Sequence, residues 1–162
     1  MHRVVGVIVQ ATTKGKAYTQ GTDFLEGEVQ RGSNWIDWYQ GVRKSGRWDL
    51  NEFPDKPILL TSVKAQSRIE DFIESAQRDF NEWYLKGSQS LEKNGLVDLE
   101  TTCSYFRIAS GPMSVWLFDA TNYSGGGYVR DFEMLKGIKD ELKSEKLETD
   151  EKLWLCCYDT HN

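Results

Sequence analysis

The sequence predicts a two-layer α+β fold: a single domain over residues 1–162, with about three helices on a mixed or antiparallel sheet of about five to six strands. Three observations predict this class. A chain of 162 residues fits one domain. Its composition, 39% hydrophobic and 12% aromatic with three prolines, is that of a folded globular chain. Apolar runs of strand length lie between stretches with helical spacing of apolar residues.

The N-terminal part is predicted to contain two strands. Arg3–Gln10 reads RVVGVIVQ, a β-branched apolar run typical of a strand that is buried on both faces. Residues 11–21 are polar with two glycines and predict a loop. Thr22–Gln30 alternates weakly and predicts a second strand, in which Gly27 marks a bulge or an edge.

A first helix is predicted to begin after Ser33, a residue type that caps helix N-termini. It should end near Ser45, because Gly46 follows. Four large apolar residues with spacings of three and four predict its buried stripe: Trp35, Trp38, Tyr39 and Val42.

The middle of the chain contains the clearest helical signal. Trp48–Pro57 predicts an irregular connection and Ile58–Val63 a strand. Ser67 is then expected to cap a helix that ends at Gly87. Its apolar residues keep helical spacing over about four turns: Ile69, Phe72, Ile73, Ala76, Phe80, Trp83 and Tyr84.

The last part is predicted to contain a β-hairpin, a helix and a strand. Leu99–Ala109 and Ser114–Ala120 flank a turn-like SGPM segment and predict the hairpin. The final strand is expected at Lys152–Tyr158. The third helix follows the NYSGGG loop, with apolar residues at helical spacing: Val129, Phe132, Leu135, Ile138 and Leu142.

The core is expected to form where these elements place their apolar residues on one face. Aromatic and β-branched residues should supply most of the buried area. The predicted core comprises Val5, Val7, Val9, Leu59, Ile69, Phe72, Ile73, Phe80, Trp83, Phe106, Ile108, Val115, Leu117, Phe132, Leu135, Ile138 and Leu153.

Charge and hydropathy limit the classes of partner. The formal net charge is −5 and the isoelectric point is about 5.1, so nucleic acid is a disfavoured partner. A protein partner with a basic surface would suit an acidic chain, and a homo-oligomer is compatible with it. No apolar run approaches the roughly 20 residues of a membrane span, and no signal peptide is evident. We therefore expect a cytoplasmic protein that does not bind membranes.

The cysteines predict neither disulfides nor a metal site. Cys103, Cys156 and Cys157 are three in number, and an odd count without a signal peptide argues against a disulfide framework. Adjacent cysteines on a strand face opposite sides and cannot share one metal ion in the usual way. All three are expected to be reduced and mostly buried, and no cofactor is predicted.

The two histidines argue against catalysis. His2 and His161 each lie one residue from an end of the chain, where backbones fray unless they are docked. Acid–base catalysis and zinc binding need a firmly held imidazole. The two rings can meet only if both ends dock side by side, so the sequence predicts no catalytic residues and favours a protein that is not an enzyme.

Two groups of residues remain as binding candidates. A loop between a strand and a helix can present backbone N–H groups to an anion, although this loop matches no phosphate-loop motif and a plain mobile connection is the favoured explanation. Its candidate ligand-binding residues are Asp119, Ser124, Gly125, Gly126 and Gly127. Aromatic side chains mark the candidate protein interface, although core packing explains the last two as well: Trp48, Phe53, Trp38 and Tyr39.

Missing catalytic patterns, acidity and six tryptophans together favour a non-enzymatic intracellular protein that binds other proteins. It would be a small acidic inhibitor of the immunity or anti-defence type, or an assembly subunit. The alternative is a small-ligand or nucleotide-binding module that uses the Gly125–Gly127 loop.

Overall fold

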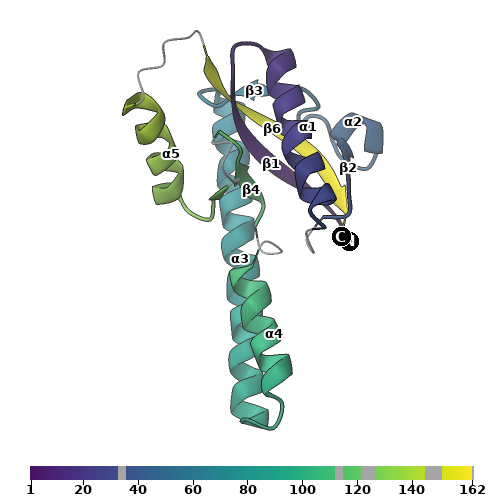
Figure 1. The fold of residues 1–162 in the computed structure, drawn as a ribbon, viewed down its shortest axis with the longest axis vertical. Helices are drawn as coiled ribbons and strands as arrows, with labels where there is room; N and C mark the ends of the chain where they lie inside the picture. The colour runs from purple at the N-terminus through teal and green to yellow at the C-terminus, as the bar shows by residue number, and fades with distance from the viewer. Residues whose placement is uncertain (33–35, 112–114, 122–126, 145–150, 162) are drawn as a thin grey trace.

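The computed structural model describes residues 1–32, 36–111, 115–121, 127–144 and 151–161. Within these ranges it contains six strands and five helices, which confirms the α+β class (Figure 1). The strands are β1 (His2–Ala11), β2 (Trp38–Gly41), β3 (Ile58–Leu59), β4 (Leu117–Asp119), β5 (Gly127–Tyr128) and β6 (Lys152–His161). The helices are α1 (Lys14–Gln30), α2 (Val42–Ser45), α3 (Val63–Asn94), α4 (Leu99–Ser110) and α5 (Phe132–Ser144).

The first and last strands form the centre of one mixed sheet. β1 and β6 pair antiparallel over their whole length, from His2 opposite His161 to Ala11 opposite Lys152. The strand order is β2-β6-β1-β4-β5 among the described residues, with β3 also paired to β6. β4 runs parallel to β1, and the remaining pairs are antiparallel. The two ends of the chain therefore lie side by side (Figure 1).

Helices cover both faces of this sheet. Alternate residues of β1 join different core clusters, with Val4 and Ile8 on one face and Val5, Val7 and Val9 on the other. The predicted strand at Arg3–Gln10 is thus confirmed as doubly buried. The Val4 face packs against α3 through Ile69, Phe72 and Ile73, and against α5 through Leu135. The Val5 face packs against α1 through Ala17 and Leu25.

Residues 14–30 form one helix, so the predicted loop at 11–21 and the predicted strand at Thr22–Gln30 are wrong. The Thr13 side chain caps α1 by accepting a hydrogen bond from the Lys16 backbone N–H at 3.3 Å. Gly21 faces the sheet, where an added Cβ would lie 2.3 Å from the Tyr158 hydroxyl oxygen. Glycine lowers helix propensity, but here it permits close helix–sheet packing, and tertiary packing outweighs propensity.

The predicted helix after Ser33 is also wrong within the described residues. Trp38–Gly41 is an edge strand that pairs with the end of β6, and only the short α2 follows it. Ser33 and Trp35 lie outside the described residues. A few aromatic and β-branched residues fit either periodicity, and pairing with β6 determines the outcome.

The predicted β-hairpin at 99–120 is replaced by a helical hairpin. α3 begins after Ser62 rather than Ser67, continues through Gly87 to Asn94, and packs against α4. Gly87 lets the Phe106 ring approach, since an added Cβ would lie 2.8 Å from it. α3 and α4 extend together well beyond the sheet (Figure 1). Of the predicted hairpin's second strand, Leu117–Asp119 is a strand.

Most of the predicted core residues are buried or partly buried, with two exceptions. Phe80 and Phe132 are exposed. Phe80 lies on the part of α3 that the sheet does not cover, so helical spacing alone did not bury it. None of the described helices is long and apolar enough to cross a membrane.

Gly6→Ala tests the packing of α3 on the central strands. An added Cβ at Gly6 would lie 2.6 Å from the Phe72 ring and 2.8 Å from Leu117 Cδ1. We expect this substitution to lower the free energy of unfolding by about 1–3 kcal/mol, as overpacking does. Gly15→Ala is the matched control because no atom lies within 4 Å of its added Cβ, and it should be neutral or stabilising by up to about 1 kcal/mol. Equal urea denaturation midpoints for the two variants would contradict this packing.

Candidate functional site

A buried carboxylate lies where the two ends of the chain meet. The side chain of Asp159, on β6, is 0% exposed. Its Oδ1 lies 3.3 Å from His2 Nδ1, and its Oδ2 lies 3.8 Å from Arg47 Nε. Among the described residues, no group donates a hydrogen bond to Oδ2. Burial of a charge is unfavourable unless it is paired, so this carboxylate depends on a histidine and an arginine that both reach solvent.

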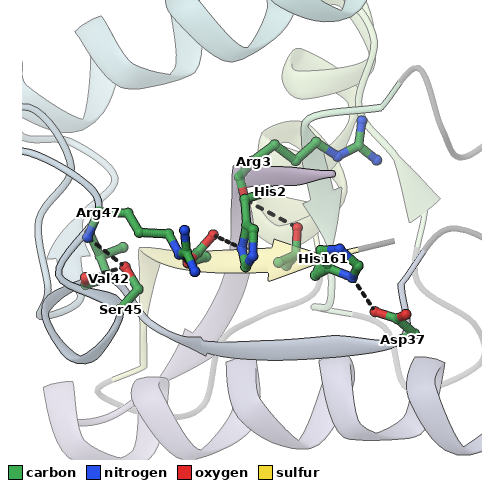
Figure 2. Close-up of polar contacts among 9 residues, drawn as sticks. His2, Arg3, Asp37, Val42, Ser45, Arg47 and His161 are labelled. Atoms are coloured by element: carbon green, nitrogen blue, oxygen red, sulfur yellow. Dashed lines mark hydrogen bonds and ion pairs between the residues drawn. The ribbon is translucent and has the colours of Figure 1, made fainter.

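A second carboxylate holds the other histidine. His161 Nδ1 lies 2.9 Å from Asp37 Oδ1 (Figure 2). This hydrogen bond is the main cause that lowers the pKa of Asp37 below its ordinary value. The two imidazoles thus have the same arrangement, in which each Nδ1 faces a carboxylate.

The sheet register brings the two rings together. His2 on β1, His161 on β6 and Trp38 on β2 form one row across three strands. Side chains directly opposite on antiparallel strands share a face of the sheet. The two imidazole centroids lie 4.9 Å apart, and the Trp38 ring meets His2 edge-on at 5.5 Å. Two residues further along, on the same face, Asp159 of β6 pairs with Gln40 of β2.

An open pocket of about 500 Å³ covers this row. Arg47 reaches it because Gly46 adopts a left-handed conformation, with φ of 64°, and ends α2. The Arg47 backbone N–H donates to Ser45 Oγ at 3.3 Å (Figure 2). We call the pocket and its buried carboxylate the terminal site, formed by His2, Asp37, Trp38, Gln40, Arg47, Asp159 and His161.

The neighbouring Arg3 is not part of the terminal site. Its guanidinium lies over the Trp116 ring at 5.3 Å from the centroid. Burial lowers the pKa of Arg3, and the charge of Asp79 opposes that change. Its guanidinium therefore packs against Trp116, and Arg3 does not line the pocket.

The terminal site has the geometry of acid–base chemistry. A carboxylate can only accept, so each hydrogen bond places a proton on Nδ1 and makes Nε2 the basic nitrogen of the neutral ring. A carboxylate behind an imidazole orients it in many catalytic sites. The expectation that His2 and His161 stay apart is wrong, because the pairing of β1 and β6 docks both ends.

Trp38 was predicted from the sequence as an interface residue, but the remaining members of the terminal site were missed: Asp37, Gln40, Arg47 and Asp159. Asp159 and His161 are two residues apart at the end of a strand, so they share a face. That spacing, together with two terminal strands of similar length, was the available signal. In the described part of the chain, no group of three or more His, Cys, Asp or Glu residues is placed to hold a metal ion.

The predicted glycine-loop site is only partly described. Asp119 ends β4, and its Oδ1 accepts hydrogen bonds from the Thr121 backbone N–H at 2.9 Å and from the Thr121 hydroxyl at 2.6 Å. Gly127 begins β5 and pairs with Asp119. The carboxylate therefore caps a turn. Three of the candidate residues lie outside the described residues: Ser124, Gly125 and Gly126.

The four aromatic residues predicted for an interface lie in different surroundings. Trp48 and Phe53 meet edge-on at 5.7 Å and pack against the core on the α3 side. The Tyr39 hydroxyl donates to Glu26 at 3.0 Å, and partial burial is the main cause that raises its pKa to about 12. Trp38 is the one of the four that is classed as exposed, and it belongs to the terminal site.

A second exposed feature is the apolar surface of the helical hairpin. Phe80, Tyr84 and Leu91 recur on α3 at helical spacing, and the first two rings stack at 5.8 Å. The turn and the start of α4 add exposed apolar residues. We call this set the hairpin face: Phe80, Tyr84, Leu91, Leu96, Val97 and Leu99.

The three cysteines are free, as expected, but only two are buried. Cys156 and Cys157 belong to opposite core clusters, as adjacent residues of a strand should. Burial raises the pKa of the Cys156 thiol to about 12. Cys103 is exposed on α4, which corrects the expectation that it is buried.

Comparisons of this chain with protein-family models, with curated proteins and with solved structures found no match.

His161→Ala tests the hydrogen bond that orients the second imidazole. In the wild-type chain we expect Asp37 to titrate below its ordinary pKa of 3.8, and in the variant we expect the pKa to return toward that value. Because the folded-state pKa is lowered, the stabilisation is present above pH 3.8 and is lost as the pH falls through the lowered pKa. Carboxyl ¹³C NMR measures both values. His2→Ala is the control and should leave the pKa of Asp37 low; an unchanged pKa in His161→Ala would contradict the pair.

Proposed function

We propose that the terminal site binds a small phosphate-bearing ligand of the nucleotide class. The observation that carries the proposal is the pair of carboxylate-held imidazoles beside Arg47 in one open pocket. The Arg47 side chain is 56% exposed, so its guanidinium can turn donors toward an oxyanion. This proposal takes up the small-ligand class, which was the alternative prediction from the sequence, and puts the ligand at the terminal site rather than at the glycine loop.

The distribution of charge supports an anionic ligand. Asp159 lies beneath His2, and Asp37 is hydrogen-bonded by His161, so both carboxylates are engaged by rings of the pocket. Arg47 adds a positive charge at the edge of the pocket.

An aromatic ring completes the match to a nucleotide. Trp38 is 38% exposed and lines the pocket beside His2. Indole rings stack on nucleobases with about 1–3 kcal/mol of favourable free energy. A phosphate at Arg47 and a base at Trp38 would together explain why the two residues line one pocket.

Arg47→Gln tests this proposal directly. We expect the Arg47→Gln variant to bind a nucleoside monophosphate about 10-fold to 100-fold more weakly than the wild-type chain does, because it loses a charged hydrogen bond. Isothermal titration calorimetry measures both affinities. Arg43→Gln is the matched control because Arg43 is exposed on α2, pairs with Asp55 and does not line the pocket. Equal affinities of the two variants would contradict the proposal.

A second candidate function is protein binding, the function favoured by the sequence, and the hairpin face supports it. α3 and α4 shield each other along one seam, where Ser90 and Thr102 hydroxyl groups lie 2.8 Å apart, and they leave apolar residues outside it. Val97 in the turn is 97% exposed. A partner protein that adds a helix to this pair would bury the hairpin face.

Substitution of the hairpin face separates this candidate from ligand binding. The test is a triple variant with Tyr84→Ser, Leu91→Ser and Leu99→Ser. We expect it to bind a partner protein at least 10-fold more weakly than the wild-type chain does. Native mass spectrometry measures the one-to-one complex of each chain with that partner. The control changes Gln89→Ser and Lys93→Ser, at exposed α3 positions on the opposite side, should leave the complex intact. A complex that survives the serine substitutions at wild-type affinity would contradict the hairpin face as the docking surface.

A further inference from the structure

We infer that the terminal site cleaves a phosphodiester bond whose neighbouring hydroxyl group is the nucleophile, as in a ribodinucleotide. The inference rests on the proposed function and adds a reaction to it. Its basis is the pairing of two imidazoles, each with Nδ1 on a carboxylate and with centroids 4.9 Å apart.

Two adjacent histidines can supply both proton transfers of this reaction. One neutral ring accepts a proton at Nε2, and one protonated ring donates a proton there. Asp159 and Asp37 hold the rings through Nδ1, which keeps Nε2 of each ring for the substrate. The centroid separation is short enough for both rings to reach atoms of one phosphate group.

Among the described residues that line the pocket, none contributes a hydroxyl or thiol group as a nucleophile. The residues that line the pocket contribute imidazole, carboxylate, indole, amide and guanidinium groups. The nearby Ser45 hydroxyl donates to the Val42 carbonyl oxygen at 2.9 Å and accepts from the Arg47 backbone N–H. Because the carboxylates of Asp159 and Asp37 face the two imidazoles, we assign the attacking oxygen to the substrate. A hydroxyl on the carbon next to the phosphate ester has the advantage of an intramolecular reaction.

The step balances without a redox partner. The neutral imidazole removes the 2′-hydroxyl proton, the 2′-oxygen forms a bond to phosphorus, and the bond from phosphorus to the 5′-oxygen breaks. The imidazolium gives its proton to the departing 5′-oxygen. The products are a 2′,3′-cyclic phosphate and a 5′-hydroxyl, and exchange with water restores both rings. Arg47 is placed to pair with the non-bridging oxygens, where negative charge develops.

The remaining features select a short, single-stranded substrate. Trp38 can stack on one base with little sequence preference. The net charge of −5 disfavours the many phosphate contacts that hold long nucleic acids. A dinucleotide needs one phosphate contact and one stacking contact, and this pocket provides both.

The test uses the untagged chain and the ribodinucleotide uridylyl-adenosine in the presence of EDTA, with its 2′-deoxy analogue for comparison. We expect a cyclic-phosphate product by ³¹P NMR, a bell-shaped dependence of kcat/KM on pH, and no cleavage of the deoxy analogue. His2→Gln and His161→Gln should each lower kcat by about 10²-fold to 10⁴-fold with little change in KM, and the double variant should lose hardly more. Thermal unfolding of each variant shows whether the sheet remains intact.

The outcomes separate this inference from the proposed function. If the deoxy analogue binds and the ribodinucleotide is not cleaved, the reaction is overturned and ligand binding stands. If neither compound binds, both proposals fail. Cleavage that persists in the folded double variant identifies a contaminating nuclease and overturns the inference. Equal cleavage of the deoxy analogue, without a cyclic product, overturns the role of the neighbouring hydroxyl.

Discussion

The antiparallel pairing of β1 with β6 is the constraint on which the rest of the structure depends. The two strands contain ten residues each and lie at opposite ends of the chain. The centre of the sheet therefore forms only when the last strand has paired with the first. The core clusters on both faces draw on these two strands. The same register sets His2 opposite His161. A shift by one residue would move every side chain of a strand to the other face, so the core and the terminal site are fixed together.

Asp159 is the residue whose presence stability alone does not explain. Its neighbours on the same face of β6, Leu155 and Cys157, are buried apolar groups of the core. An apolar residue in its place would avoid the desolvation of a carboxylate, and replacement of buried ion pairs by apolar groups is often neutral or stabilising. The carboxylate is instead held by His2 and Arg47, both of which line an open pocket. Local departures of this kind from what favours folding are expected at functional sites.

The sequence predicts elements with one strong signal and fails where the signals conflict. The strand at 3–10 is continuously β-branched, and α3 keeps its periodicity for several turns, so both were predicted. α1 was missed because Gly15, Gly21 and Gly27 lower the helix propensity of a segment that packing against the sheet stabilises as a helix. α4 was predicted as a strand because the turn-like SGPM segment at its end suggested a β-hairpin. The terminal site was excluded because it requires the register between His2 and Asp159, which are 157 positions apart. Local patterns contain no information about such a pairing.

The two surfaces that support the two candidate functions are physically separate. The terminal site draws its lining from β1, β6, β2 and the segments flanking β2 and α2, and none of its residues belongs to α3 or α4. The hairpin face lies on α3, α4 and the turn between them, beyond the edge of the sheet (Figure 1). α3 connects the two regions, because Ile69 and Phe72 pack against the face of the sheet that contains Asp159, and the same helix continues into the hairpin. A partner on the hairpin face would leave the pocket open, so the two proposed functions can be tested independently.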